Sequence, residues 1–72
     1  MMRKLTAHVA SLPDRENVVY EIYYGPNQVA EISNEPGSDL QIEIYSCPDK
    51  VAWSFSFNEF RSLIEQAERN IT

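Results

Sequence analysis

The stretch VAWSFSFNEF, residues 51–60, decides the fold because its hydrophobic period changes partway along it. Its first half alternates, as half-buried strands do, with Val51, Trp53 and Phe55 on one side. Ser56 is followed three residues later by Glu59, the capping-box spacing in which two side chains accept backbone N–H groups at a helix start. The stretch therefore predicts a strand over 51–55 and a helix that begins at Ser56.

The residues beyond the cap have the period of an amphipathic helix. Its apolar face comprises Phe60, Leu63, Ile64, Ala67 and Ile71. Phe55 before the cap and Phe60 in the first turn have the spacing of a hydrophobic staple, which fixes how the chain leaves the strand. We expect this helix to lie across a sheet with its apolar face inward.

Three earlier runs, 18–24, 28–33 and 40–45, also alternate, and turn sequences separate them. Short connections between them predict an antiparallel meander in chain order. The expected cross-strand pairs are Tyr24–Gln28, Ile22–Ala30, Tyr20–Ile32, Ile32–Leu40, Ile44–Trp53 and Ile42–Phe55. Each pair keeps apolar residues on one face, which is the condition that a buried face imposes on register.

The first segment, residues 4–11, fits two structures. A helix would align Leu5, Val9 and Leu12, whereas a strand would align Leu5, Ala7 and Val9. We favour the strand, because the turn at 11–17 would fold it back against 18–24. The fold class is thus α+β, a single domain over 1–72 with an antiparallel meander of four strands, or five with this segment, and one C-terminal helix on its apolar face.

The expected core follows from these faces. Its members are Val18, Tyr20, Ile22, Ala30, Ile32, Leu40, Ile42, Ile44, Trp53, Phe55, Phe60, Leu63, Ile64 and Ala67. The opposite face carries glutamates and tyrosines together with Val19 and Val29. We expect the aromatic residues of 51–60 to belong to the core rather than to a base-stacking platform. Their alternation puts them on the same face of the sheet as the aliphatic residues of the other strands, and no basic residue lies among them.

Composition excludes several function classes. Six basic against eleven acidic residues give a net charge of −5, and the basic ones are scattered, which argues against nucleic-acid binding. The single cysteine, Cys47, cannot form an intramolecular disulfide, which favours the cytoplasm, and no apolar run is long enough to span a membrane. Nothing places Cys47 beside the only histidine, His8, and neither lies in a catalytic or metal-binding signature. We expect no enzyme, cofactor or metal.

The candidate protein-binding residues are Glu21, Tyr23, Glu31, Glu43 and Tyr45 on the outer face. The register puts Glu21 opposite Glu31, and like charges in that position cost stability. Such a face is either a solvated surface or a site for the Arg and Lys side chains of a basic protein. The second interpretation predicts a small acidic binding module of the inhibitor or immunity type. The alternative is a structural homodimer, in which an edge strand or this face pairs with a second copy.

Several motifs resemble those of a class of small uncharacterised bacterial proteins. The motifs are EIYYG, AEIS, IEIYSCPD, WSFSFNEF and LIEQA, and they cover about two thirds of the chain from Tyr20 onward. In that class a strand pair around a Pro-Asp turn leads through Trp-x-Phe into a C-terminal helix. The resemblance implies a bacterial origin and a shared fold, and it assigns no functional residues.

Overall fold

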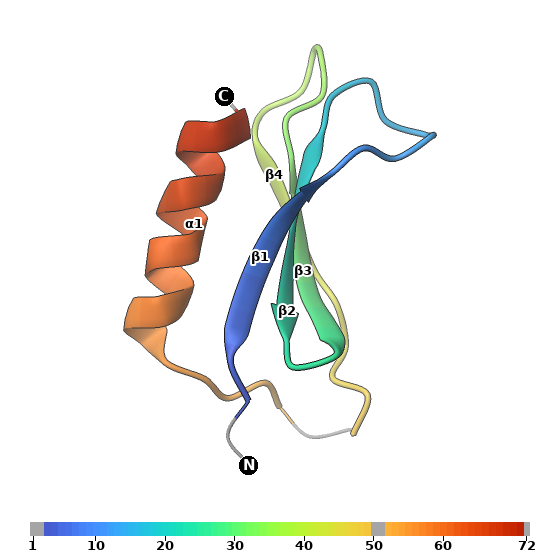
Figure 1. Cartoon of the computed structure of the whole chain (residues 1–72). Coiled ribbons are helices and arrows are strands. Elements are labelled where there is room, and N and C mark those ends of the chain that lie inside the picture. The colour runs from blue at the N-terminus through green and yellow to red at the C-terminus, as the bar shows by residue number, and fades with distance from the viewer. Residues whose placement is uncertain (1–2, 50–51, 72) are drawn as a thin grey trace.

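The computed structural model describes residues 3–49 and 52–71, which form one antiparallel sheet and one helix (Figure 1). The elements are β1 (Leu5–Ala10), β2 (Val19–Tyr24), β3 (Asn27–Ser33), β4 (Gln41–Ile44) and α1 (Phe57–Ile71). The strands follow one another in chain order across the sheet, and α1 covers one of its faces. The predicted α+β meander with a C-terminal helix is confirmed.

The first segment is a strand, as favoured above. β1 runs antiparallel to β2, with Ala7 opposite Ile22 and Val9 opposite Tyr20. A helix over the same residues would also have aligned its apolar residues. The strand is preferred because it pairs the outer edge of β2 with a neighbour and places Leu5 and Ala7 against the core.

The hairpin between β2 and β3 has the expected central pairs, Ile22–Ala30 and Tyr20–Ile32, but not the expected turn. Tyr24 pairs with Asn27 instead of Gln28, so the turn has two residues and a β-bulge follows it. Gly25 takes a φ of 61°, in the left-handed region that favours glycine. The bulge absorbs the extra residue that a shorter turn leaves over.

β3 and β4 pair two residues away from the predicted register. Ile32 lies opposite Ile42, whereas Leu40 was expected there and lies before β4 in the connecting loop. A shift by two preserves parity, so each side chain stays on the predicted face of the sheet. The longer loop at 34–40 is what allows the shift.

The predicted strand over 51–55 is wrong. Residues 52–55 form no strand, so the expected pairs Ile44–Trp53 and Ile42–Phe55 do not form; Val51 lies outside the described residues. The physical reason is the path to the helix: α1 packs mainly on β1 and β2, so the chain that leaves β4 must cross the end of the sheet (Figure 1). Aromatic contacts hold this crossing in place of a ladder.

Two of those contacts centre on Phe55. Its ring lies 5.5 Å from that of Tyr24 and 5.2 Å from that of Phe60, which confirms the contact expected of a hydrophobic staple. The Trp53 indole N–H donates to the Tyr45 carbonyl over 2.6 Å. Trp53 and Phe55 therefore reach the core from an irregular segment.

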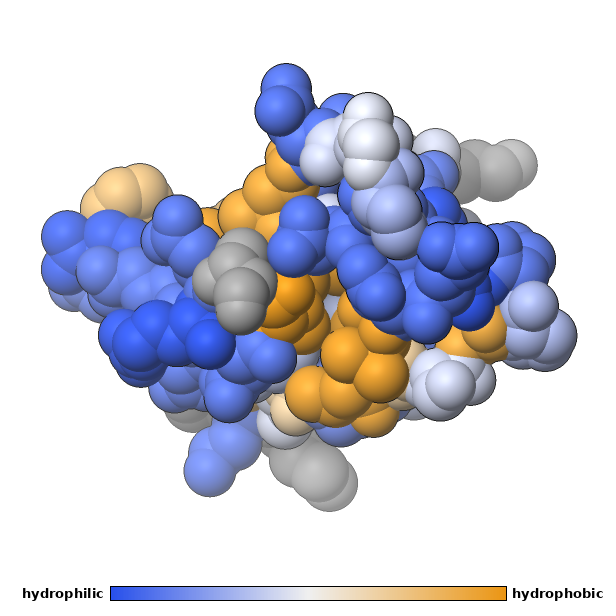
Figure 2. Space-filling model, turned by 90° about the horizontal axis from the view of Figure 1, so that it is seen from above, coloured by the Kyte–Doolittle hydropathy of each residue, from blue (hydrophilic) through white to orange (hydrophobic). Residues whose placement is uncertain are grey.

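The helix begins where the sequence predicts. The backbone N–H of Glu59 donates to the Ser56 hydroxyl over 3.2 Å, and that of Phe60 to the Ser56 carbonyl over 3.0 Å. Ala67 is fully buried, and the rest of the predicted helix face packs around the core. Seen from above, hydrophobic atoms lie between the largely hydrophilic outer surface of the helix and the sheet (Figure 2).

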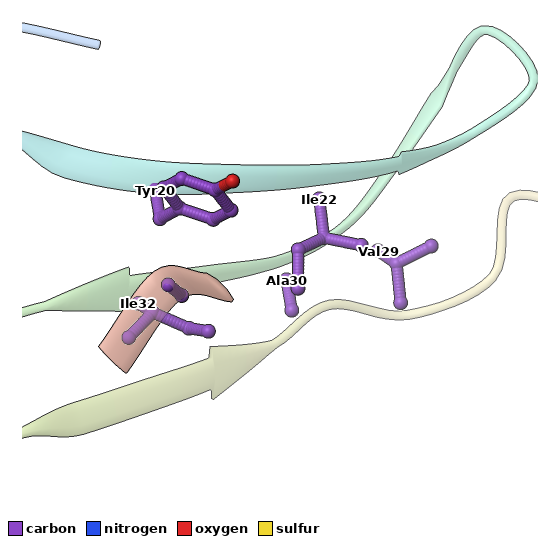
Figure 3. Packing of buried hydrophobic residues seen from close by; sticks show 6 residues of the cluster. Tyr20, Ile22, Val29, Ala30 and Ile32 are labelled. Atoms are coloured by element: carbon purple, nitrogen blue, oxygen red, sulfur yellow. The ribbon is translucent and has the colours of Figure 1, made fainter. Parts of the chain in front are cut away.

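The fully formed core is smaller than predicted and lies over β2 and β3. Its buried members are Tyr20, Ile22, Val29, Ala30, Ile32 and Ala67 (Figure 3). Four residues predicted to be core are instead exposed: Val18, Leu40, Ile42 and Ile44. The helix leans toward β1 and β2 and leaves the β4 end of the inner face uncovered, which accounts for the last three; Val18 precedes β2.

Val19 and Val29, predicted to face outward, are buried as well. Val29 is the extra residue of the bulge and joins the cluster around Ile22, because a bulge turns a side chain away from strict alternation (Figure 3). Val19 does lie on the outer face. The loop between β1 and β2 covers that end of the face, where Arg15 of the loop reaches Glu31.

Candidate functional site

The outer face of the sheet carries a row of ionisable residues, one from each strand. His8 of β1 lies opposite Glu21 of β2, Glu21 opposite Glu31 of β3, and Glu31 opposite Glu43 of β4. The predicted Glu21–Glu31 pairing is therefore present, and a second pair of like charges lies beside it. Each such pair costs about 0.2–1 kcal/mol unless another group compensates it.

Two side chains of the same chain provide that compensation. The Arg15 guanidinium donates to Glu31 over 2.7 Å and to Glu43 over 3.1 Å, so one cation bridges two carboxylates. The His8 Nε2 atom lies 2.9 Å from a Glu21 oxygen at the other end of the row. Three carboxylates thus face one guanidinium and one imidazole. The row remains negative whichever charge the imidazole carries.

Burial divides the row into a structural part and an accessible part. The Glu31 side chain is only 7% exposed and that of Glu21 14%, whereas the Glu43 side chain is 56% exposed. A buried carboxylate needs its cation partner, because an unpaired buried charge is strongly destabilising. Glu31 is therefore held by Arg15 as part of the fold, and Glu43 is the carboxylate that an incoming cation can reach.

The two predicted tyrosines lie at different ends of this face. The Tyr23 ring stacks on that of His8, with centroids 5.1 Å apart. Tyr45 follows β4, two residues beyond Glu43, and is 37% exposed. Partial burial raises the pKa of the Tyr45 phenol, and the negative charges of Glu31 and Glu43 raise it further. Tyr45 and Glu43 therefore form the accessible end of the predicted site.

The loop between β1 and β2 was not predicted to take part in the site. The backbone N–H groups of Glu16 and Asn17 donate to the Glu35 carboxylate, each over 2.9 Å, which ties this loop to the one after β3. This anchoring positions Arg15 above the row. The sequence does not indicate that Arg15 contacts Glu31 and Glu43, because Arg15 lies outside the alternating segments. His8 could have been found, since strand parity in 4–11 puts it on the outer face.

A second feature lies on the inner side of β4. Ile42 is 45% exposed and Ile44 64%, and Leu40 beside them is also exposed. Together with Ile32 and with Ile64 of the helix, Leu40 and Ile42 line an open groove of about 210 Å³ between α1 and the sheet. Gln41 and Glu68 form its polar margin. β4 thus has an acidic outer side and an exposed apolar inner side.

Within residues 3–49 and 52–71, no cluster of His, Cys, Asp and Glu has the arrangement of a metal site. The helix in this part of the chain lacks the length and apolar character that crossing a membrane would need. Cys47 is a free, half-buried thiol. Comparison with family models, curated proteins and solved structures finds no match to the chain.

Proposed function

We propose that this chain is a non-enzymatic binding module that receives a basic protein at the β4 end of its outer sheet face. The observation that carries the proposal is the in-register row of three glutamates with a single bridging arginine. Arg15 and His8 compensate these like charges only in part, because three carboxylates face one guanidinium and one imidazole. A partner that supplies a cation at Glu43 adds to this compensation on binding.

The accessible geometry agrees with this role. Glu43 is more than half exposed although Arg15 contacts it, so an Arg or Lys of a partner can bind the same carboxylate from outside. Tyr45 lies next to it as a stiff amphipathic side chain, a type enriched at protein interfaces. Of the five predicted residues, Glu43 and Tyr45 would contact the partner. Glu21, Glu31 and Tyr23 would position these two residues, and the two glutamates would maintain the negative electrostatic potential of the outer face.

The test is quantitative capture from host lysate by immobilised protein, with every captured protein identified by mass spectrometry. Glu43→Lys reverses the charge of the accessible carboxylate, and Glu65→Lys makes the same change on the exposed side of α1. We expect wild type and Glu65→Lys to enrich the same basic protein, and Glu43→Lys to lose it. Equal enrichment by both variants, or a captured partner of acidic charge, would contradict the proposal.

A second function, the structural homodimer, is favoured by one observation, the exposed apolar side chains on β4. An edge strand with such residues is a surface on which a second copy can add its own strand. Sedimentation and thermal melts over a wide concentration range distinguish the homodimer from the monomeric binding module. A dimer would gain mass and melting temperature with concentration, whereas a monomeric binding module would not.

A further inference from the structure

We propose that the edge of β4 accepts an extended segment of the partner as a fifth strand, one in which apolar and cationic residues alternate. This inference rests on the proposed function and specifies the binding mode. It joins the two features of β4, since one added strand would cover its apolar inner side and its acidic outer side together. This mode of recognition obtains affinity from main-chain hydrogen bonds and specificity from alternate side chains.

The backbone of β4 is suited to such pairing. β4 is the last strand of the sheet, and all four of its residues are exposed. The Tyr45 N–H donates to the Val29 carbonyl over 2.9 Å. Because hydrogen-bonded pairs alternate in antiparallel sheets, Glu43 and Gln41 then bond toward β3, and the N–H and C=O groups of Ile42 and Ile44 point to the outer edge.

Side chains on the two sides of β4 set the pattern of the incoming strand. Ile42 and Ile44 project to the inner side, and Ile42 lines the groove that extends to Ile64 of the helix. Apolar residues of the added strand would cover them. The intervening residues would lie on the outer side near Glu43 and Tyr45, where the excess negative charge favours Lys or Arg.

A second copy of this chain fits the edge less well. When β4 pairs antiparallel with β4 of a second copy and apolar residues stay on the inner side, Glu43 faces an odd-numbered residue of the mate, and the nearby ones are Asp39, Gln41, Glu43 and Tyr45. None of these carries a positive charge. Self-pairing would also bring together two chains of net charge −5. Charge complementarity therefore selects a basic strand.

The probe is a seven-residue peptide of alternating Lys and Val with blocked ends. A block-ordered peptide of the same composition, four Lys followed by three Val, is the matched control. We expect the alternating peptide to bind more tightly and to slow amide hydrogen exchange of Ile42 and Ile44 about tenfold. Exchange at Glu43 should change little, because its N–H already bonds to β3.

Two variants separate the backbone contribution from the side chain. Ile44→Ala removes the apolar side chain and keeps the N–H, whereas Ile44→Pro also removes the N–H, a change that edge strands tolerate. We expect Ile44→Pro to bind the alternating peptide about fivefold more weakly than Ile44→Ala does.

Three results would overturn the inference. Equal affinity for both peptides without protection of Ile42 and Ile44 would agree with a basic partner but contradict its binding as an added strand. If neither peptide binds while the lysate partner is still captured through Glu43, the added strand is contradicted as well, and the proposed basic partner is not. Protection of these amides in the protein alone, with a dimer mass in sedimentation, would assign the edge to a second copy.

Discussion

The most informative stability comparison uses two isoleucines on the same face of the sheet. Ile22 of β2 is fully buried, whereas Ile44 of β4 is 64% exposed. Replacing a fully buried isoleucine by alanine costs about 2–5 kcal/mol, from lost transfer energy and the cavity left behind. About a third of Ile44 is buried and its site can collapse into solvent, so Ile44→Ala should cost about 1 kcal/mol.

Urea denaturation followed by circular dichroism measures both changes under the same conditions. If the Ile22→Ala protein does not fold, the milder substitutions Ile22→Val and Ile44→Val allow the same comparison, with smaller losses of unfolding free energy. Equal losses of unfolding free energy at the two positions would contradict the difference in burial between Ile22 and Ile44. They would mean that Ile44 is covered in solution, and that the edge of β4 is not available to a partner.

Three further predictions concern single side chains. Ser56→Ala should lower the free energy of unfolding by about 1 kcal/mol in thermal melts, because the N–H of Glu59 loses its cap. Backbone N–H donors lower the pKa of Glu35, so its stabilising effect is full above the ordinary pKa of glutamate and is lost as the pH falls through the folded-state value. Glu35→Gln should therefore flatten the acid limb of stability against pH, and an unchanged limb would contradict this. Burial raises the pKa of Tyr45, so a phenolate absorbance titration should include a component that ionises above the ordinary value for tyrosine, and Tyr45→Phe should remove that component.

The parts of the fold that depend on side-chain period could be predicted from the sequence. Alternation identified β2 and β3 and their central pairs Ile22–Ala30 and Tyr20–Ile32. The capping-box spacing identified Ser56 as the residue that caps the N-terminus of α1. These features are local, so the residues that determine them lie within a few positions of one another.

The errors arose where the position of one element depends on another. Trp53 and Phe55 alternate as a strand does, but the helix lies over β1 and β2, and the chain must cross the sheet end to reach it. The same placement of the helix leaves Ile42 and Ile44 exposed, although parity alone assigns them to the core. Local pattern contains no information about how far along a sheet a helix will lie.

The candidate site shows the same division. Parity placed Glu21, Glu31 and Glu43 on one face, and the structure brings them into one row. The sequence could not show that Arg15 bridges two of them, because its position depends on the path of a loop. That bridge changes the interpretation of the site from an open acidic patch to a compensated row with one accessible end.

Chemical-shift mapping tests directly whether a basic partner binds along β4. Isotope-labelled protein would be titrated with the basic protein identified by capture, and the backbone amide shifts would be compared along the chain. We expect the largest changes within residues 41–45 and small ones on the exposed side of α1 around Glu65. Changes confined to the helix, with residues 41–45 unaffected, would contradict it.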